Sequence, residues 1–531
     1  MSRTERFLAG GLALLLLLAR GAAFFRYRFD SDEPQHLHVA WGWTQGLVQY
    51  RDLFDNHAPL FHLVTAPWLA LFGERANILF YMRALMIPIW IFVAAVTWIV
   101  AKRFSSTRVA IWSVLILHLF PTFFLKSIEY RTDNLWLGLW MAALLVLTGG
   151  ELTTPRMFAT GLILGTSACV SLKTTLLVIT LLLASTTTWI LSNKTREWRD
   201  ALRVVIPALL GLIIVPALIA GAFVKLGAWP DLIYCNFTFN ELVSKTRAHS
   251  QFVRVIYLPV LILMIYALGE RAAKIDFDRA ARWRFFIFTF ALFFMLTLAC
   301  WWILISARDL LAVLPLCAMI IALWVDGQPF RTPALAAWTL LCLFGLGHYS
   351  EWLKNDTREF TTMMDQVLGL TRPGEPLMDY KGETIYRRRP YYFIFEAIGR
   401  AELKHGLIPD TIKSDMIKAR CHVAQADGRF WPPRAKDFLA EHFIDVGRLR
   451  VSGNVIPESG AFETAIAGRY VIIDKHGIAA GTLDGAPYHG AVDLAPGMHH
   501  FTRATDERVA WLWAPAFERG YSPFHLRDLD F

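Results

Sequence analysis

The chain has 531 residues, of which 55% are hydrophobic and only 18% are charged, and its mean hydropathy is +0.40. A soluble protein of this length could not bury so much apolar surface, so the composition excludes an ordinary soluble enzyme. The formal net charge is +9, but the patterned basic motifs of nucleic-acid-binding proteins are absent from the sequence. We therefore expect a multi-pass membrane protein.

Apolar windows of about 20 residues, each long enough to cross a hydrocarbon core of roughly 30 Å, predict about eleven membrane-spanning helices. The first window also resembles a signal peptide, but the number of windows that follow favours a retained helix. Beyond Ser350 the sequence becomes mixed, which predicts a membrane domain over 1–350 and a soluble domain over 351–531. The predicted spans lie near 7–25, 77–101, 109–125, 134–150, 157–172, 174–192, 204–226, 253–269, 285–305, 309–325 and 332–348.

Basic residues predict the orientation of these spans. With the N-terminus in the cytoplasm, the short inner loops are densely basic and the outer loops are less so, as the positive-inside rule requires. An odd number of spans then places residues 351–531 outside the cell, on the same face as the first long loop, 30–76. The inner basic residues are Lys102, Arg103, Arg108, Arg156, Lys194, Arg196, Arg199, Arg203, Arg271, Lys274, Arg279, Arg282, Arg284 and Arg331.

The first outer loop concentrates carboxylates and histidines directly after an apolar helix. Pro34 suits the first turn of a helix, with Asp32 or Glu33 as its cap. This helix and a second one over 60–72 are too short to cross the membrane. We expect both to lie along its surface, with Trp41, Trp43 and Trp68 at headgroup depth.

Two acidic clusters result, one of Asp30, Asp32 and Glu33 and one of Asp52 and Asp55. A carboxylate at a helix N-terminus is favoured in its ionised form, in which it can act as a general base. Together with a neighbouring His it can also bind a divalent cation. Spacing alone leaves open whether these acids catalyse a reaction or only cap a helix.

The order of residues in this loop resembles the first outer loop of polyprenyl-phosphate-dependent glycosyltransferases of the C-type fold. The resemblance is to family 39, which includes the protein O-mannosyltransferases and the lipid A aminoarabinose transferases. One position departs from the family pattern, because Ala58 stands where the family often has the first of two prolines. "YRTDN" at 130–134 and "SARDLLAVLPLCAMI" at 306–320 extend the resemblance more weakly. The matching residues of the loop are Asp32, Glu33, Gly46, Tyr50, Asp52, Asp55, His57, Pro59 and Leu60.

The resemblance implies a multi-pass enzyme of the bacterial inner membrane. It would transfer one sugar, a hexose or a pentose, from a polyprenyl-phosphate donor to a lipid, glycan or protein acceptor in the cell envelope. Asp32 would be the base of an inverting reaction, supported by Glu33. Donor-phosphate binding is expected from Arg308, Arg131 and Lys173, and the candidates for orienting the acceptor or holding a cation are Asp55, His57 and Asp133. A divalent metal ion at Asp55 and His57 remains open, as does a gating role for the outer loop 225–254.

The soluble region shows two patterns. Residues 374–445 mix short extended runs with helical ones, which indicates a small α/β unit, and residues 455–531 alternate in the manner of short antiparallel strands. Arg387, Arg388 and Arg389 form either a basic-aromatic binding patch or a solvated charge run. Cys235 and Cys421 both lie on the predicted outer face, where a disulfide between them is an open alternative, and the sequence holds no CxxC pair.

Three other functions are less well supported. A lipid or glycan transporter or flippase would show repeats and charges at the membrane midplane, and we find neither in the sequence. An oligosaccharyltransferase would carry a Trp-Trp-Asp motif in its soluble domain, whereas Trp301 and Trp302 lie in a predicted span without a following Asp. A non-catalytic scaffold for envelope assembly would not need so many carboxylates beside the membrane.

Overall fold

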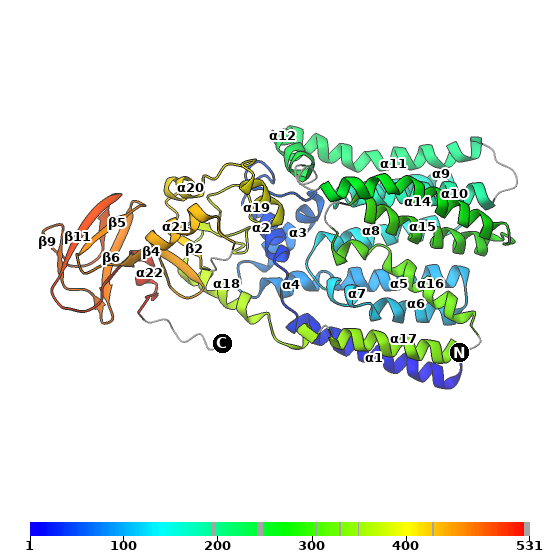
Figure 1. Cartoon of the computed structure of the whole chain (residues 1–531), viewed down its shortest axis with the longest axis horizontal. Coiled ribbons are helices and arrows are strands. Elements are labelled where there is room, and N and C mark those ends of the chain that lie inside the picture. The colour runs from blue at the N-terminus through cyan, green and yellow to red at the C-terminus, as the bar shows by residue number, and fades with distance from the viewer. Residues whose placement is uncertain are drawn as a thin grey trace.

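The structure of the chain is a computed structural model that describes residues 1–192, 198–241, 248–302, 305–328, 331–348, 350–426 and 430–524. A bundle of long helices occupies one end of the elongated molecule and a strand-rich region the other, with α2 and α3 between them (Figure 1). The predicted fold class, a polytopic helical domain followed by a soluble domain of mixed α/β and strand-rich character, is confirmed.

Every predicted span coincides with a helix or with a pair of consecutive helices. Six helical stretches are long and apolar enough to cross a membrane: Arg3–Arg26, Ile78–Phe104, Thr174–Ser192, Ala201–Lys225, Arg254–Ala272 and Arg279–Trp301. The remaining apolar helices of the bundle are shorter. The helices of the bundle are α1 (Arg3–Arg26), α4 (Ile78–Ala84), α5 (Ile87–Phe104), α6 (Thr107–Leu119), α7 (Pro121–Lys126), α8 (Thr132–Leu147), α9 (Thr154–Ala168), α10 (Thr174–Ser192), α11 (Trp198–Lys225), α14 (Ala248–Ala272), α15 (Arg279–Trp301), α16 (Leu314–Asp326) and α17 (Arg331–His348).

Small residues bring α9 and α11 together. A Cβ atom at Gly161 would lie 1.9 Å from the carbonyl oxygen of Ala208, and one at Gly211 would lie 2.2 Å from that of Phe158. Only glycine permits this approach, which is the usual basis of close helix packing within membranes.

The first outer loop forms α2 (Asp32–Thr44) and α3 (Leu60–Phe72). Helix α2 begins at Asp32, two residues before the expected start. Its N-cap residue, Ser31, makes no side-chain capping hydrogen bond, and the Asp30 carboxylate accepts from the Asp32 amide at 3.2 Å. The prediction of headgroup contact is wrong for Trp41, which is buried because the C-terminal region covers α2. Trp68 on α3 is 46% exposed, as expected for a side chain facing lipid.

The predicted gate lies partly outside the described residues. The described portion contains α12 (Trp229–Ile233) and a π-helical turn, η1 (Tyr234–Thr238). Phe239 of this segment packs against Phe54 of the first loop, with ring centroids 4.7 Å apart. The segment is therefore attached to the loop that carries the candidate site.

A C-terminal region of short helices and strands follows the bundle. Short 3-10 turns η2 (Ala307–Leu310) and η3 (Ser350–Leu353) flank the last bundle helices, and α18 (Arg358–Leu370) leads into the C-terminal region. Its helices are α19 (Ala397–Lys404), α20 (Ile412–Lys418), α21 (Pro433–His442) and α22 (Ala514–Glu518). The strands are β1 (Leu377–Met378), β2 (Val423–Gln425), β3 (Phe443–Asp445), β4 (Leu449–Val455), β5 (Ala461–Thr464), β6 (Gly468–Asp474), β7 (Gly477–Ile478), β8 (Gly481–Leu483), β9 (Ala486–Pro487), β10 (Val492–Leu494), β11 (Gly497–Arg503) and β12 (Ala510–Trp513).

The strands form an eight-stranded sheet and a four-stranded sheet. The larger sheet has the order β1-β2-β4-β12-β6-β10, with β3 on β4 and β7 on β6, and the smaller has the order β5-β11-β8-β9. Strands β1 and β2 pair in parallel, while β12 runs antiparallel to β6 with Trp511 opposite Ile472. Trp511 and Phe462 stack between the sheets at 5.6 Å, so the two sheets share one apolar core.

Both sequence-based interpretations of the arginine run at 387–389 are wrong for two of its members. Arg387 is buried and donates to Glu74 at 3.0 Å and to the Thr371 hydroxyl at 2.7 Å. Arg389 is also buried, 2.8 Å from Asp379, and only Arg388 is exposed. The open alternative of a Cys235–Cys421 disulfide is not realised, because both thiols are free.

Candidate active site

Asp32 lies at the junction between the helical bundle and the C-terminal region. Its Oδ1 is 2.5 Å from the Nζ of Lys381, and its Oδ2 forms an ion pair with the guanidinium of Arg131. The Asp32 side chain is 24% exposed, so it is more accessible than the charged groups around it. The proposed base is thus held between two cations, one from each part of the chain.

Asp30 joins the two predicted phosphate-binding arginines. Arg131 Nη1 is 2.7 Å from Asp30 Oδ1, and Arg308 forms an ion pair with the other carboxylate oxygen. Arg308 also donates through Nε to Glu129 at 2.9 Å. The structure therefore brings Arg131 and Arg308 together beside Asp32.

Lys173 and Asp133 form a deeper layer of the same network. The Lys173 ammonium is 2.6 Å from Asp133 and 2.5 Å from Asp309. Asp133 in turn accepts from Arg131 Nε at 3.2 Å. Lys173 is thus linked to Asp32 by successive ion pairs through Asp133 and Arg131.

Glu33 is fully buried, although it adjoins Asp32 in the sequence. Arg83 of α4 binds both of its carboxylate oxygens, at 2.5 and 2.7 Å. The backbone amides of Asp30 and Tyr130 donate to the same carboxylate at 2.8 and 2.9 Å. With every oxygen engaged, Glu33 is placed to hold α2 against the bundle, and its contribution to catalysis stays a prediction.

Asp55 lies in a second cluster, made largely of histidines. His57 Nδ1 is 2.8 Å from Asp55 Oδ1, and Gln49 donates to the other oxygen at 2.7 Å. His62 Nδ1 lies 3.5 Å from Asp55, and His62 Nε2 lies 3.0 Å from His36 Nδ1. Because His36 is one helical turn beyond Asp32 on α2, this cluster adjoins the acidic one.

The arrangement of Asp55 and His57 does not fit a metal site. The carboxylate and the imidazole bind each other, whereas two ligands of one cation would both be directed at the ion. Within the described part of the chain, no group of three or more His, Cys, Asp or Glu side chains is arranged to hold a metal ion. We therefore derive no step through a metal.

The C-terminal region contributes residues that no sequence pattern singled out. Lys381 reaches Asp32, and Glu396 accepts a hydrogen bond from Asn56 at 2.9 Å. Gly382 has a φ of +90°, and a Cβ atom there would lie 2.7 Å from the ring of His38. The loop around Lys381 therefore packs on α2 at a distance that no larger residue would allow at position 382.

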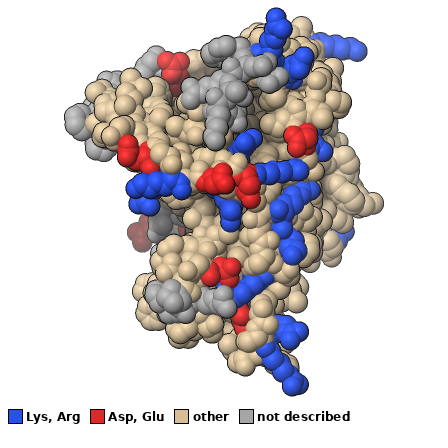
Figure 2. All heavy atoms as spheres, turned by 90° about the vertical axis from the view of Figure 1, so that its right-hand side faces the viewer, with Lys and Arg blue, Asp and Glu red and all other residues tan. Residues whose placement is uncertain are grey.

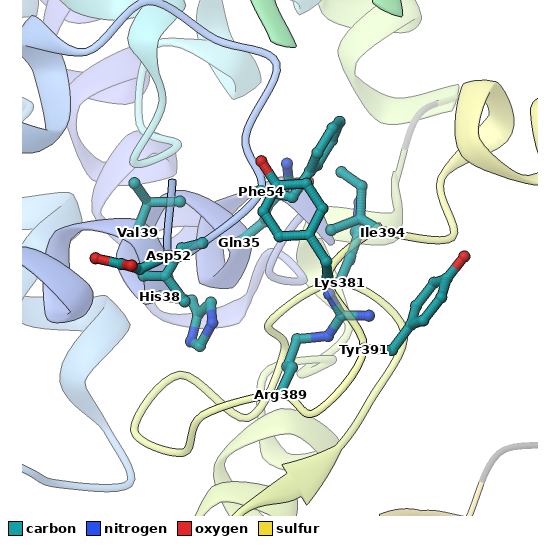
Figure 3. A pocket seen from close by; sticks show the side chains of 11 residues that line it. Gln35, His38, Val39, Asp52, Phe54, Lys381, Arg389, Tyr391 and Ile394 are labelled. Atoms are coloured by element: carbon teal, nitrogen blue, oxygen red, sulfur yellow. The ribbon is translucent and has the colours of Figure 1, made fainter. Parts of the chain in front are cut away.

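A small pocket adjoins this contact. It has a volume of about 20 Å³, enough for roughly one water molecule. Gln35 and His38 of α2 line it together with Lys381 and Arg389 of the C-terminal region, as Figure 3 shows. The Oε1 and Nε2 atoms of the Gln35 side chain are buried without a hydrogen-bond partner in the structure. A polar molecule bound in the pocket would supply those hydrogen bonds.

The charges set the protonation of the acids. Burial alone would raise the pKa of Asp32, but Arg131 and Lys381 outweigh burial and hold that pKa well below its usual range. Asp30 behaves similarly, because Arg131 and Arg308 outweigh burial and lower its pKa. Both carboxylates are therefore ionised at neutral pH.

The pKa values of the neighbouring groups shift in different directions. Burial lowers the pKa of His36 well below its usual value, which keeps the imidazole neutral. For His57, burial is outweighed by Asp55, and the pKa is raised. Burial and the charge of Asp32 raise the pKa of Glu396. Near the ionised Asp32 thus lie Glu396, whose pKa is raised, and His36, whose imidazole is neutral.

Comparison with known proteins identifies the fold. No protein-family description and no curated protein sequence matches the chain. Among solved structures it is similar to ArnT from Cupriavidus metallidurans bound to undecaprenyl phosphate, with a TM-score of 0.56 and 13% identity, covering 85% of this chain and 98% of that one. The apo form of the same ArnT gives a TM-score of 0.55 and 14% identity over the same shares of both chains. At these identities the similarity shows the fold, so the chain has the C-type fold of these ArnT structures that the first outer loop predicted.

Proposed function

We propose that this protein transfers a single sugar from a polyprenyl-phosphate donor to an envelope acceptor, at the outer face of a bacterial inner membrane. Asp32 would be the general base. The observation that carries the proposal is an ionised, partly exposed carboxylate at the start of α2, beside two arginines, in a chain with the fold of a protein solved with undecaprenyl phosphate.

The reaction needs one base and one site for a leaving anion. An acceptor hydroxyl would attack the anomeric carbon from the face opposite the phosphate and so invert the configuration. The new C–O bond forms as the bond from the anomeric carbon to the phosphate oxygen breaks, the acceptor proton passes to Asp32, and the electron pair leaves with polyprenyl phosphate. A positioned base of this kind contributes about 10²–10⁴-fold to a rate.

Arg131 and Arg308 are suited to the leaving phosphate, because guanidinium groups bind phosphate oxygens in pairs and stabilise charge as it develops. Both arginines already bind carboxylates, so the donor would share them with Asp30 and Asp32. A phosphate that engages Arg131 would weaken its hold on Asp32 and thereby raise the pKa of Asp32. The base would become stronger only once the donor is bound.

The remaining predicted residues would position these groups. Asp133 binds Arg131 and Lys173 together, so it would orient Arg131, and Lys173 would add positive charge from the deeper layer. The Asp55–His57 pair lies beside His36, with the ring centroids of His36 and His57 4.5 Å apart. From there the pair would orient the acceptor.

The test is transfer of labelled sugar from a polyprenyl-phosphate donor by the purified, lipid-reconstituted protein. We expect Asp32→Asn to reduce transfer about 10²–10⁴-fold while the thermal unfolding temperature is retained. Asp493→Asn, the same chemical change at an exposed position of β10, is the matched control and should be fully active. Full activity of a folded Asp32→Asn protein would refute the role of Asp32. Absence of transfer by the unmodified protein with any envelope acceptor would refute the function itself.

A further inference from the structure

The opposite end of the helical bundle carries a second group of basic residues with a different environment. Figure 2 looks onto this end, where Lys and Arg side chains form a broad band among Asp and Glu. Helix α5 ends here at Phe104, α8 ends at Leu147 and α15 begins at Arg279. The distribution of basic residues predicts that this end faces the cytoplasm.

Three arginines gather over the end of α8. Arg103 donates to the carbonyl oxygen of Leu145 at 2.8 Å and to Thr148 at 2.7 Å. Arg156 lies over the adjacent turn, where its Nη1 is 2.4 Å from the place of a Cβ atom at Gly150. Arg103 is close enough to Arg156 and Arg279 to be repelled by their charges.

These arginines differ in their partners from Arg108, which lies at the same end of the bundle. Among the described residues, none forms an ion pair with Arg103, Arg156 or Arg279. By contrast, Arg108 at the same end lies 2.6 Å from Glu5 and also pairs with Asp326. Arg108 therefore has its charge balanced by carboxylates, whereas the three arginines of the cluster have no such partner in the described part of the chain.

A cleft of about 520 Å³ opens between Arg103 and Arg279. Arg103 and Phe104 of α5 line it on one side, and Arg279 and Ala280, the first residues of α15, line it on another. Asp278 also lines the cleft, but its carboxylate caps α15 by accepting from the amide of Ala281 at 2.6 Å. The positive end of the α15 dipole adds to the charge of the arginines.

We propose that this cleft binds the phosphate headgroup of an anionic phospholipid from the inner leaflet. Arg103 and Arg279, neither of which forms an ion pair in the part of the chain that the structure describes, match a phosphodiester in charge and in hydrogen-bond donors. The apolar part of the lining favours a lipid over a soluble anion, because Phe104 lines the cleft and stacks on Trp283 at 5.6 Å. Farther along the two lining helices, Trp98 and Phe288 are 41% and 45% exposed and offer apolar surface to an acyl chain.

Native mass spectrometry of the full chain tests the proposal. The protein is equilibrated with phosphatidylglycerol or phosphatidylcholine and the retained lipid is counted. We expect phosphatidylglycerol to be retained and phosphatidylcholine not, and we expect Arg279→Gln to reduce retention roughly fivefold. Lys102→Gln removes an exposed charge next to Arg103 and is the matched control. The Lys102 ammonium donates to Thr107, so this variant should retain lipid normally. Equal retention of the two lipids, or an equal loss in the control, would overturn the proposal.

Two further arms complete the experiment. Arg103 supports the end of α8, so Arg103→Gln is interpreted only beside Arg279→Gln and a measured unfolding temperature. Inorganic phosphate is added at millimolar concentration as a competitor. Retention of the lipid supports a lipid site, whereas displacement would show that the cleft recognises phosphate alone and would overturn the assignment to a lipid. Sugar transfer is not part of the readout, so the result is independent of the function proposed above.

Discussion

The acidic cluster around Asp32 adjoins the histidine cluster around Asp55 through His36, one helical turn beyond Asp32 on α2, yet the two clusters differ in how their side chains are charged. Asp30 and Asp32 stay ionised because Arg131, Arg308 and Lys381 supply full positive charges from separate segments. In the second cluster burial dominates, and His36 stays neutral.

The difference teaches that composition does not determine the electrostatic character of a site. Both clusters combine carboxylates with basic groups in a largely buried setting. In the acidic cluster the cations cannot lose their protons near neutral pH, so the charges are kept. Imidazoles can lose theirs, so in the other cluster burial keeps His36 neutral while Asp55 favours the charged form of His57. The proposed base is thereby placed beside a neutral hydrogen-bonding group.

The largest effect is expected from breaking the buried Glu33–Arg83 ion pair beside the acidic cluster. Glu33→Gln leaves Arg83 buried without a carboxylate, which we expect to destabilise the protein by about 3–5 kcal/mol. Thermal unfolding in detergent, followed by intrinsic fluorescence, measures the change. Adding Arg83→Met should restore part of the stability by removing the unpaired charge. An unaltered unfolding temperature in Glu33→Gln would show that the acidic cluster does not depend on this buried pair.

A smaller effect is expected from removing one cation from Asp32. Lys381→Met should reduce kcat/KM roughly tenfold, because Asp32 is less well positioned. It should also move the acidic limb of the pH–rate profile upwards, because the pKa of Asp32 rises when a neighbouring positive charge is lost. Lys381→Arg keeps the charge and should leave that limb in place. A limb at the same pH in both variants would contradict the electrostatic role of Lys381.

The smallest effect concerns His57. Its raised pKa means that protonation favours the folded state, so this stabilisation is fully present below the ordinary value of 6.5 and is lost as pH rises through the raised pKa. We expect His57→Gln to abolish this alkaline loss, as measured by chemical unfolding between about pH 6 and 9. His489→Gln, at an exposed position of the C-terminal region, should retain it. Persistence of the alkaline loss in His57→Gln would show that the histidine cluster keeps its charge differently.

Much of the fold and part of the site could be predicted from the sequence. Apolar windows locate the helices because burial in lipid requires long runs of apolar residues. The order of residues in the first loop selected Asp32, and weaker local matches selected Arg131 and Arg308. Lys381 and Glu396 were missed because neither stands in a distinctive pattern, and their role depends on a contact between segments about 350 residues apart.

The prediction for the arginine run at 387–389 was wrong for a related reason. A sequence shows that three positive charges are adjacent, but it does not show which distant groups receive them. Arg387 meets Glu74 of the first outer loop, and Arg389 meets Asp379. Burial of the run follows from these partners, and no periodicity in the run itself reveals them.

The contact of Gly382 with His38 has a consequence for engineering. Because no side chain fits at position 382, the loop that delivers the Lys381 ammonium to Asp32 tolerates neither substitution nor displacement there. A chimera that joined this helical bundle to the C-terminal region of another protein could keep both apolar cores and still leave Asp32 with a single cation. The two parts of the chain therefore cannot be exchanged as independent modules.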